Sequence, residues 1–331
     1  MNINGHLIMI DGATRFDRTM SIRGWVQSSD ALKEISLAKT NLAIAQVHEV
    51  KLREGTAPVD GRLTYDFTLQ VLTHSPYDLA EELFLELQLT SGSTEKVSLK
   101  ELSTERFELY RTPKMYQEFI QRVKDHTGAK VLDIGGRDRS QYDRAEAFPG
   151  VDYTVLDIVP SSNVDVVGDA HQLSQYFSAE KFDYVFSSSV FEHLAMPWKV
   201  VLEINKVLKV GGFIYTQAPH TCGLHDMPWD FWRFSDASWD AIFNEKTGFE
   251  IVDRALDYEA YILPFLYRSD MNDAEKAAGF ENSAVLARKI SNTELTWDVD
   301  PAEIMQGEYP QDSDSTSPSL WSHIKGLLKR R

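Results

Sequence analysis

Hydrophobic and polar residues alternate with a period of two along the first third of the chain. Successive side chains of a strand point to opposite faces, so this alternation predicts short strands, each with one buried face. Turn signals such as EGTAPVDG and SGST separate the strands, which favours an antiparallel β-sandwich over residues 1–108. The predicted strands cover residues 18–27, 33–40, 41–50, 62–73, 82–90 and 95–102.

The period changes after residue 108. Met115, Phe119, Ile120 and Val123 recur at helical spacing, and Gly128 follows as a stop signal. Strands are then predicted at 130–134, 152–157, 164–167, 183–187, 212–217, 249–256 and 284–290. Helices are predicted between most of them, at about 140–147, 171–178, 197–208 and 236–246.

This alternation of strands and helices predicts an α/β domain over residues 109–290, with a parallel sheet covered on both faces. Ligands bind at the carboxyl ends of the strands in such sheets. Residues 219–235 and 257–283 are predicted to be long insertions beside that edge.

Two further segments are predicted at the end of the chain. Residues 291–319 are acidic and rich in Ser, Pro and Asp, which predicts a disordered linker. Residues 320–331 regain helical spacing and carry a basic face. They predict an amphipathic helix that docks on an anionic membrane or a partner, folds back on its own chain, or forms a frayed solubilising end.

Composition narrows the function. The 331 residues suffice for two domains and a tail, and the net charge of −16 argues against non-specific binding of nucleic acid. The single cysteine, Cys222, excludes an internal disulfide and a cysteine-based zinc site. The opening MNINGHLIMIDG has no signal-peptide pattern, and no apolar run approaches the length of a membrane span, so we expect a cytoplasmic protein.

The stretch KVLDIGGRDRS, residues 130–140, predicts a buried strand that leads into a glycine loop. A dinucleotide requires G-x-G-x-x-G, because its pyrophosphate must approach the backbone and a helix N-terminus. Here Arg137 and Asp138 follow Gly136. S-adenosylmethionine carries no phosphate, so its demands on this loop are looser.

Acidic residues at successive strand ends favour the same cofactor. Asp133 ends the first strand of the domain. Asp157 ends the second, where a carboxylate can accept both ribose hydroxyls. Asp169 ends the third and can accept from the adenine amino group. The predicted cofactor-binding residues are Asp133, Gly135, Gly136, Asp157, Ile158, Asp169, Ala170 and Ser187.

Five motifs occur in order: VLDIGG, LDI, GDA, FDYVFSSSVFEHL and VLKVGG. In this order they resemble a class I S-adenosylmethionine-dependent methyltransferase of the type 11 group over residues 112–256. The resemblance implies a Rossmann-like fold and methyl transfer from that cofactor. The family pattern D-x-G-x-G departs at its last glycine, which is Arg137 here. Its side chain either pairs with the cofactor carboxylate or is a solvated loop arginine.

A hydroxyl acceptor would need a general base, and several side chains near the predicted edge could serve. The predicted catalytic residues are His193, His220 and His225, and Asp226 adjoins the last of them. The resemblance implies that His193 either lies near the transferred methyl group or has a structural role. No H-E-x-x-H motif or clustered Cys/His spacing is present, so no metal is predicted.

The stretch MPWDFWRFS, residues 227–235, crowds four aromatic residues together. Their faces either pack against a sugar or the cofactor, or form a hydrophobic plug. Arg233 is predicted to pair with Asp230 or another nearby acid in a structural role.

The absence of one sequence motif narrows the class of methyl acceptor. Methyltransferases that act on DNA bases and other planar nitrogens carry Asn/Asp-Pro-Pro-aromatic after the fourth strand, where this chain reads SSSV. This favours O-methylation of a hydroxylated small molecule or a glycan, as in polysaccharide biosynthesis. Residues 22–37 resemble the opening hairpin of immunoglobulin-like modules that accompany glycan-handling enzymes, although the sandwich could equally mediate a homodimer. The rival prediction is a non-catalytic binding protein that recruits glycans or protein partners.

Overall fold

The computed structural model describes residues 2–3, 6–16, 19–38, 43–53, 61–73, 83–138, 144–262, 278–305 and 309–310. The chain divides into two compact units, Met1–Tyr110 and Arg111–Arg331. Among the residues in these ranges, no helix is long and apolar enough to cross a membrane.

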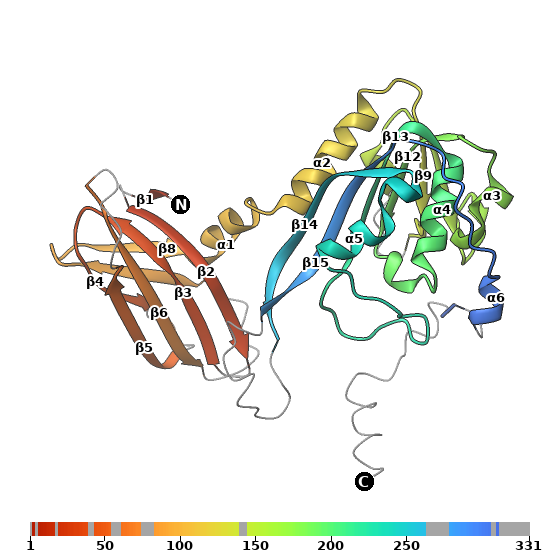
Figure 1. Cartoon of the computed structure of the whole chain (residues 1–331). Coiled ribbons are helices and arrows are strands. Elements are labelled where there is room, and N and C mark those ends of the chain that lie inside the picture. Colours follow the sequence, from red (N-terminus) through yellow and green to blue (C-terminus); the bar gives the residue numbers. More distant parts are fainter. Residues whose placement is uncertain are drawn as a thin grey trace, which may run out of the picture. The chain divides into compact units, whose positions relative to one another are not determined.

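The first unit contains two antiparallel sheets (Figure 1). The five-stranded sheet has the order β1 (Asn2–Ile3), β2 (His6–Phe16), β3 (Thr19–Ser28), β6 (Leu63–Thr73) and β5 (Ala43–Leu52). The three-stranded sheet has the order β4 (Leu32–Leu37), β7 (Phe84–Leu89) and β8 (Thr94–Ser98).

Side chains from both sheets form one apolar core, which includes Ile22 of β3, Phe67 of β6 and Leu87 of β7. Every second residue of β3 from Met20 to Ser28 is buried, as the period of two predicts. The prediction of an antiparallel, strand-rich region is confirmed, and its immunoglobulin-like character stays a prediction.

The strand predicted over residues 95–102 is wrong in its second half. β8 ends at Ser98, and α1 (Leu99–Phe107) begins at once. The Ser98 hydroxyl accepts the backbone N–H of Glu101 at 3.3 Å, as an N-cap does. Leu99 and Leu102 still reach the core, because residues three apart share one face of a helix.

The second unit contains a seven-stranded sheet. Its order is β11 (Val166–Val167), β10 (Asp152–Asp157), β9 (Lys130–Ile134), β12 (Phe182–Ser188), β13 (Leu208–Pro219), β15 (Ala278–Lys289) and β14 (Phe249–Tyr261). The first five strands pair in parallel. β15 runs antiparallel to both of its neighbours, so the expectation of a wholly parallel sheet is wrong at this edge.

The stretch 257–283, predicted to be an insertion, is partly a β-hairpin. β14 and β15 continue as a paired hairpin as far as Tyr261 and Ala278, so the described parts of this stretch belong to the sheet. Strand pairing satisfies their backbone groups, and the sequence alone did not indicate this pairing.

Apolar clusters lie on both faces of the sheet. Val131 and Leu132 are neighbours on β9, and alternate residues of a strand point to opposite faces. Val131 packs with Phe119 of α2 (Arg111–Lys124), and Leu132 belongs to the cluster of α4 (Pro197–Val207) and α5 (Asp236–Ile242). Helices therefore cover both faces, and the prediction of a Rossmann-like α/β domain is confirmed.

Several predicted helices are shorter than expected. The helix expected at 140–147 is described only as the 3₁₀ turn η1 (Arg144–Ala147). The helix expected at 171–178 is η2 (Ala170–Gln172) followed by α3 (Leu173–Tyr176). α5 ends at Ile242 and is followed by η4 (Glu245–Thr247).

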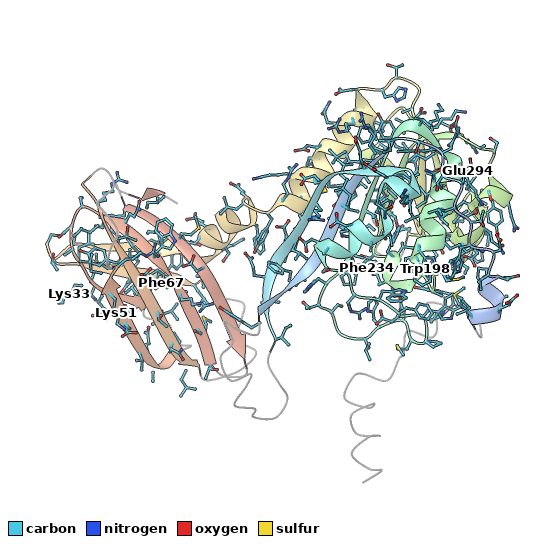
Figure 2. The ribbon with its side chains drawn as sticks, in the orientation of Figure 1. Lys33, Lys51, Phe67, Trp198, Phe234 and Glu294 are labelled. Carbon is cyan, nitrogen blue, oxygen red and sulfur yellow. The ribbon has the colours of Figure 1, made fainter. Side chains whose placement is uncertain are left out.

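The disordered linker predicted over 291–319 is wrong for residues 291–305, which pack on the second unit. Lys199 of α4 donates to the carbonyl of Val299 at 2.6 Å. The ring of Trp297 lies 5.7 Å from that of Trp198, which Figure 2 labels. α6 (Pro301–Ile304) ends this segment with a cap from Asp300. The helix predicted at 320–331 lies outside the described residues.

Candidate functional site

A cavity of about 270 Å³ opens at the carboxyl edge of the parallel strands. Gly135 follows β9, Asp157 ends β10 and Ser188 ends β12, and all three line it. This is the place where sheets of this topology bind ligands. Loop residues complete the wall, among them Arg137, Arg144, Asp169, Ala170, His171, Glu192, His193, His225, Asp226, Trp229 and Tyr309.

The turn after β9 has room for glycine alone. Gly135 has φ +73°, and a Cβ there would lie 2.2 Å from a methyl carbon of Val190. A Cβ on Gly136 would lie 2.3 Å from the carboxylate of Asp133. The backbone of Gly135 is therefore bare where it lines the cavity, which fits the close approach of a cofactor. Gly136 lies behind the lining.

Asp133 supports this turn from beneath and does not line the cavity. Its carboxylate is fully buried and accepts the Tyr153 hydroxyl at 2.7 Å and Arg144 Nη1 at 3.4 Å. Burial raises the pKa of Asp133 to about 6, and the positive charge of Arg144 opposes that rise. Asp133 thus holds Arg144, which does line the cavity.

Asp157 and Arg137 interact directly. The side chain of Arg137 is buried, and its Nε lies 3.9 Å from Asp157 Oδ1. The backbone N–H of Arg137 donates to Oδ2 at 3.3 Å, and that of Val159 donates to Oδ1 at 2.8 Å. The interpretation of Arg137 as a solvated loop arginine is therefore wrong. Ile158, the residue after Asp157, also lines the cavity.

Asp169 is held by His171, a residue that the sequence did not single out. His171 Nε2 accepts the backbone N–H of Met196 at 3.2 Å, so the ring proton lies on Nδ1. Nδ1 donates to Asp169 Oδ1 at 2.6 Å. Burial alone would raise the pKa of Asp169, but the hydrogen bond from His171 outweighs it and lowers that pKa. A charged Asp169 beside Ala170 can accept from an adenine amino group.

Four titratable side chains meet at the other end of the cavity. His193 Nε2 lies 3.8 Å from Glu192 Oε1 and 3.9 Å from Asp226 Oδ2, and the rings of His193 and His225 are 4.8 Å apart. Burial lowers the pKa of His193 and raises that of Glu192 to about 7. Glu192, His193 and His225 offer ligand atoms within 4.8 Å of one another, a grouping that the sequence spacing did not predict.

Four predicted site residues do not line this cavity, namely Asp133 and Gly136 beneath the turn, and also His220 and Ser187. His220 Nδ1 lies 3.2 Å from the carbonyl oxygen of Phe280, and His220 does not line the wall. The structure therefore brings His193 and His225 together without His220. Ser187 is fully buried, whereas Ser188 and Ser189 line the cavity in its place.

The aromatic residues of 227–235 belong partly to a hydrophobic plug and partly to the cavity wall. Phe234 stacks on Trp239 with ring centres 4.6 Å apart, so it belongs to the plug. Trp229 lines the cavity, and Phe231 and Trp232 are partly exposed. Arg233 donates to both oxygens of Asp230 at 2.6 and 2.8 Å, which confirms the predicted pair.

Arg144, His171, Glu192 and Tyr309 line the cavity but were missed. Glu192 could have been noted as the neighbour of His193, and His171 as the residue that follows GDA. Nothing in the sequence marked Tyr309 as a site residue, because it lies far along the chain in the acidic segment. Its hydroxyl donates to Asp226 at 3.1 Å.

Comparison with known proteins found one matching family model and similarity to solved structures. Residues 137–216 match the family model described as "Methyltransferase domain". A SAM-dependent methyltransferase from Archaeoglobus fulgidus is 18% identical, with a TM-score of 0.39, and the match covers 58% of this chain and all of that one. The trans-methyltransferase CalH in complex with SAH is 19% identical, with a TM-score of 0.38, and the match covers 52% of this chain and 54% of that one. The sequence has no match among curated proteins.

The glycine turn, the carboxylates at successive strand ends and the matched domain agree on one activity and one cofactor. The chain is a methyltransferase whose cofactor is S-adenosylmethionine.

Proposed function

We propose that the chain methylates a hydroxyl oxygen of a small hydroxylated molecule or a glycan. The observation that supports this most is the tautomer of His193. Its Nδ1 lies 2.8 Å from the carbonyl oxygen of Trp229, which can only accept a hydrogen bond. The ring proton therefore lies on Nδ1, and Nε2 keeps its lone pair for the proton of an acceptor hydroxyl.

The proposed cofactor contacts lie along the opposite wall. Asp157 accepts the ribose hydroxyls, Asp169 accepts the adenine amino group, and the bare backbone of Gly135 lies against the amino-acid part. S-adenosylmethionine supplies a methyl group that is already activated on a sulfonium. The protein has to align the acceptor oxygen with that group and exclude water.

Proton transfer completes the reaction. As the acceptor oxygen bonds to the methyl carbon, its proton passes to Nε2 of His193. The imidazolium that forms lies beside Glu192 and Asp226, whose carboxylates stabilise its charge.

The surroundings of this end support a sugar-like acceptor. Trp229 and Tyr309 both line the cavity, with ring centres 5.6 Å apart, and aromatic faces stack on the apolar faces of sugars. The antiparallel sheets of the first unit fit an immunoglobulin-like module that binds a glycan or a second copy of the chain. The net charge of −16 disfavours a nucleic acid acceptor.

The test is methyl transfer from S-adenosylmethionine to matched panels of alcohols, sugars, polysaccharides and amines, with the product bond identified by NMR. We expect a methyl ether. His193→Ala should lower kcat by about 10²–10⁴, whereas His126→Ala, at an exposed position after α2, should not. A methylamine product, or full activity of His193→Ala, would refute the proposal.

A further inference from the structure

We propose that Glu192, His193 and His225 form a binding site for one divalent transition-metal ion at the acceptor end of the cavity. The site itself stands on the geometry of these side chains. The role given to the ion below rests on the proposed methylation of a hydroxyl, but with an ion bound the base would be Asp226 instead of His193.

The three side chains are fixed by two connected segments. Glu192 and His193 belong to the 3₁₀ turn η3 (Phe191–His193) after β12, and His225 lies in the loop after β13. The Glu192 carbonyl accepts the backbone N–H groups of Phe231 and Trp232 at 2.8 and 3.1 Å. These bonds tie the loop that carries His225 to the turn that carries the other two residues.

Both histidines have the tautomer that a metal requires. His193 Nδ1 lies 2.8 Å from the carbonyl oxygen of Trp229, and His225 Nδ1 lies 3.1 Å from that of Gly223. A carbonyl only accepts, so each Nδ1 carries the proton and each Nε2 keeps its lone pair. Histidine ligands of metal ions commonly donate their other N–H to a carbonyl in this way.

Glu192 supplies the second, independent observation. Its side chain is 1% exposed, and Oε2 has no hydrogen-bond partner among the described residues. A buried carboxylate oxygen without a partner is costly, and a cation would satisfy it. Arg233 in the neighbouring loop is engaged with both oxygens of Asp230.

The donor set indicates the class of ion. Two imidazole nitrogens and one carboxylate suit Zn²⁺, Mn²⁺, Fe²⁺ or Co²⁺ better than Mg²⁺ or Ca²⁺, which prefer oxygen ligands. Three protein ligands leave open positions for oxygens of the acceptor. Asp226, with Oδ2 3.9 Å from His193 Nε2, places a second carboxylate beside the site.

The ion would change how the acceptor hydroxyl loses its proton. A hydroxyl that coordinates a divalent ion has a lowered pKa. Its proton then passes to Asp226, while Nε2 of His193 holds the ion instead of the proton. The oxygen–methyl bond forms, the sulfur–methyl bond breaks, and S-adenosylhomocysteine leaves.

The test uses the full chain after treatment with a chelator and removal of that chelator. Calorimetric titration with MnCl₂ should show one ion per chain, and CoCl₂ should give the visible absorption of a site with nitrogen ligands. Glu192→Gln and His225→Ala each remove a ligand, so each should weaken Mn²⁺ binding by more than the roughly 10–100-fold that loss of an outer-shell partner costs. His220→Ala is the matched control, because His220 lies outside the cavity, and it should bind Mn²⁺ like the wild type.

Titration of each variant with S-adenosylhomocysteine shows whether its cavity is intact. No binding of Mn²⁺, Co²⁺ or Zn²⁺ to the wild type, or equal Mn²⁺ binding by Glu192→Gln, would overturn the inference. Equal methylation rates before and after chelation would remove the ion's role and leave the proposed function standing. If no hydroxyl acceptor is methylated at all, the proposed function fails, and the ion titrations still decide the site.

Discussion

The side chain of Arg137 lies on the carboxylate of Asp157, with Nε 3.9 Å from Oδ1. Arg137 occupies the position at which the D-x-G-x-G pattern has its last glycine. Its backbone N–H also donates to Asp157, so the loop is tied to the end of β10 at residue 137. The departure from the pattern therefore leaves the turn at Gly135 intact and places a positive charge beside the predicted ribose site.

Arg137→Ala tests whether the guanidinium of Arg137 pairs with Asp157 or with the carboxylate of the cofactor. Because Arg137 pairs with Asp157, we expect the substitution to change the affinities for S-adenosylhomocysteine and for 5′-methylthioadenosine by the same factor. Only the former ligand has a carboxylate. If Arg137 bound that group, S-adenosylhomocysteine alone would lose about tenfold or more, as a charged hydrogen bond predicts. Calorimetric titration of the wild type and the variant with both ligands distinguishes the two outcomes.

Asp157→Ala provides the reference for that experiment. Both ligands carry the ribose, so both should lose about tenfold or more in affinity when the accepting carboxylate is removed. Unchanged binding of either ligand would contradict the role proposed for Asp157.

His171→Phe tests whether His171 positions Asp169. The substitution keeps an aromatic ring but removes the Nδ1 donor, so Asp169 loses the hydrogen bond that orients it. We expect S-adenosylhomocysteine to bind about tenfold more weakly, which corresponds to one charge-assisted hydrogen bond.

The matched ligand for this variant is S-inosylhomocysteine, which lacks the adenine amino group. Its affinity should change much less, because Asp169 has no amino group to accept from. An equal loss for both ligands would indicate general damage to the cavity instead of a role in adenine recognition.

The centre of the sheet was predictable because β9 and β12 are buried on both faces and read as continuous apolar runs. β9 and β10 have the predicted bounds, since their apolar runs end sharply at a loop. The hairpin of β14 and β15 was not predictable in full, because its outer ends are polar and owe their structure to backbone pairing. The start of α1 was missed because VSLKEL fits a strand and a helix equally well until the Ser98 cap is considered.

The part of the site in which each strand end supplies a single carboxylate could be predicted from the sequence. Asp157 and Asp169 needed only their positions in the order of strands. The cluster at the acceptor end combines Glu192 and His193 with His225 and Tyr309, which lie much farther along the chain. Sequence spacing does not reveal how a loop folds back, so this grouping required the structure.

Asp133→Asn tests the burial of the carboxyl that supports Arg144. Burial raises the pKa of Asp133 from 3.8 to about 6 in the folded chain. The folded state therefore binds more protons than the unfolded state between these values, so the wild type loses stability as pH rises through this window. Relative to Asp133→Asn, its free energy of unfolding should fall by about 1 kcal/mol from pH 5 to pH 7.

Urea unfolding at several pH values measures this difference. Asp183→Asn is the control, because the pKa of Asp183 is lowered; burial raises it, but the hydrogen bond from Lys209 outweighs that effect. Its stability is lost only as pH falls below 3.8, outside this window. A constant difference between the wild type and Asp133→Asn would mean that Asp133 titrates normally.

Asn205→Ala tests the packing of residues 291–305 on the second unit. The buried amide of Asn205 donates to the carbonyls of Thr247 and Ser291 at 3.0 and 2.9 Å and accepts the N–H of Thr293 at 3.2 Å. Its loss leaves three backbone groups without this partner, at a cost of about 2–4 kcal/mol in the free energy of unfolding.

The control is Asn292→Ala, at an exposed position one residue from Ser291, which should cost less than about 0.5 kcal/mol. Urea unfolding gives both values, and limited proteolysis should cut Asn205→Ala faster within 291–305. Equal effects of the two substitutions would show that the amide of Asn205 does not hold this segment.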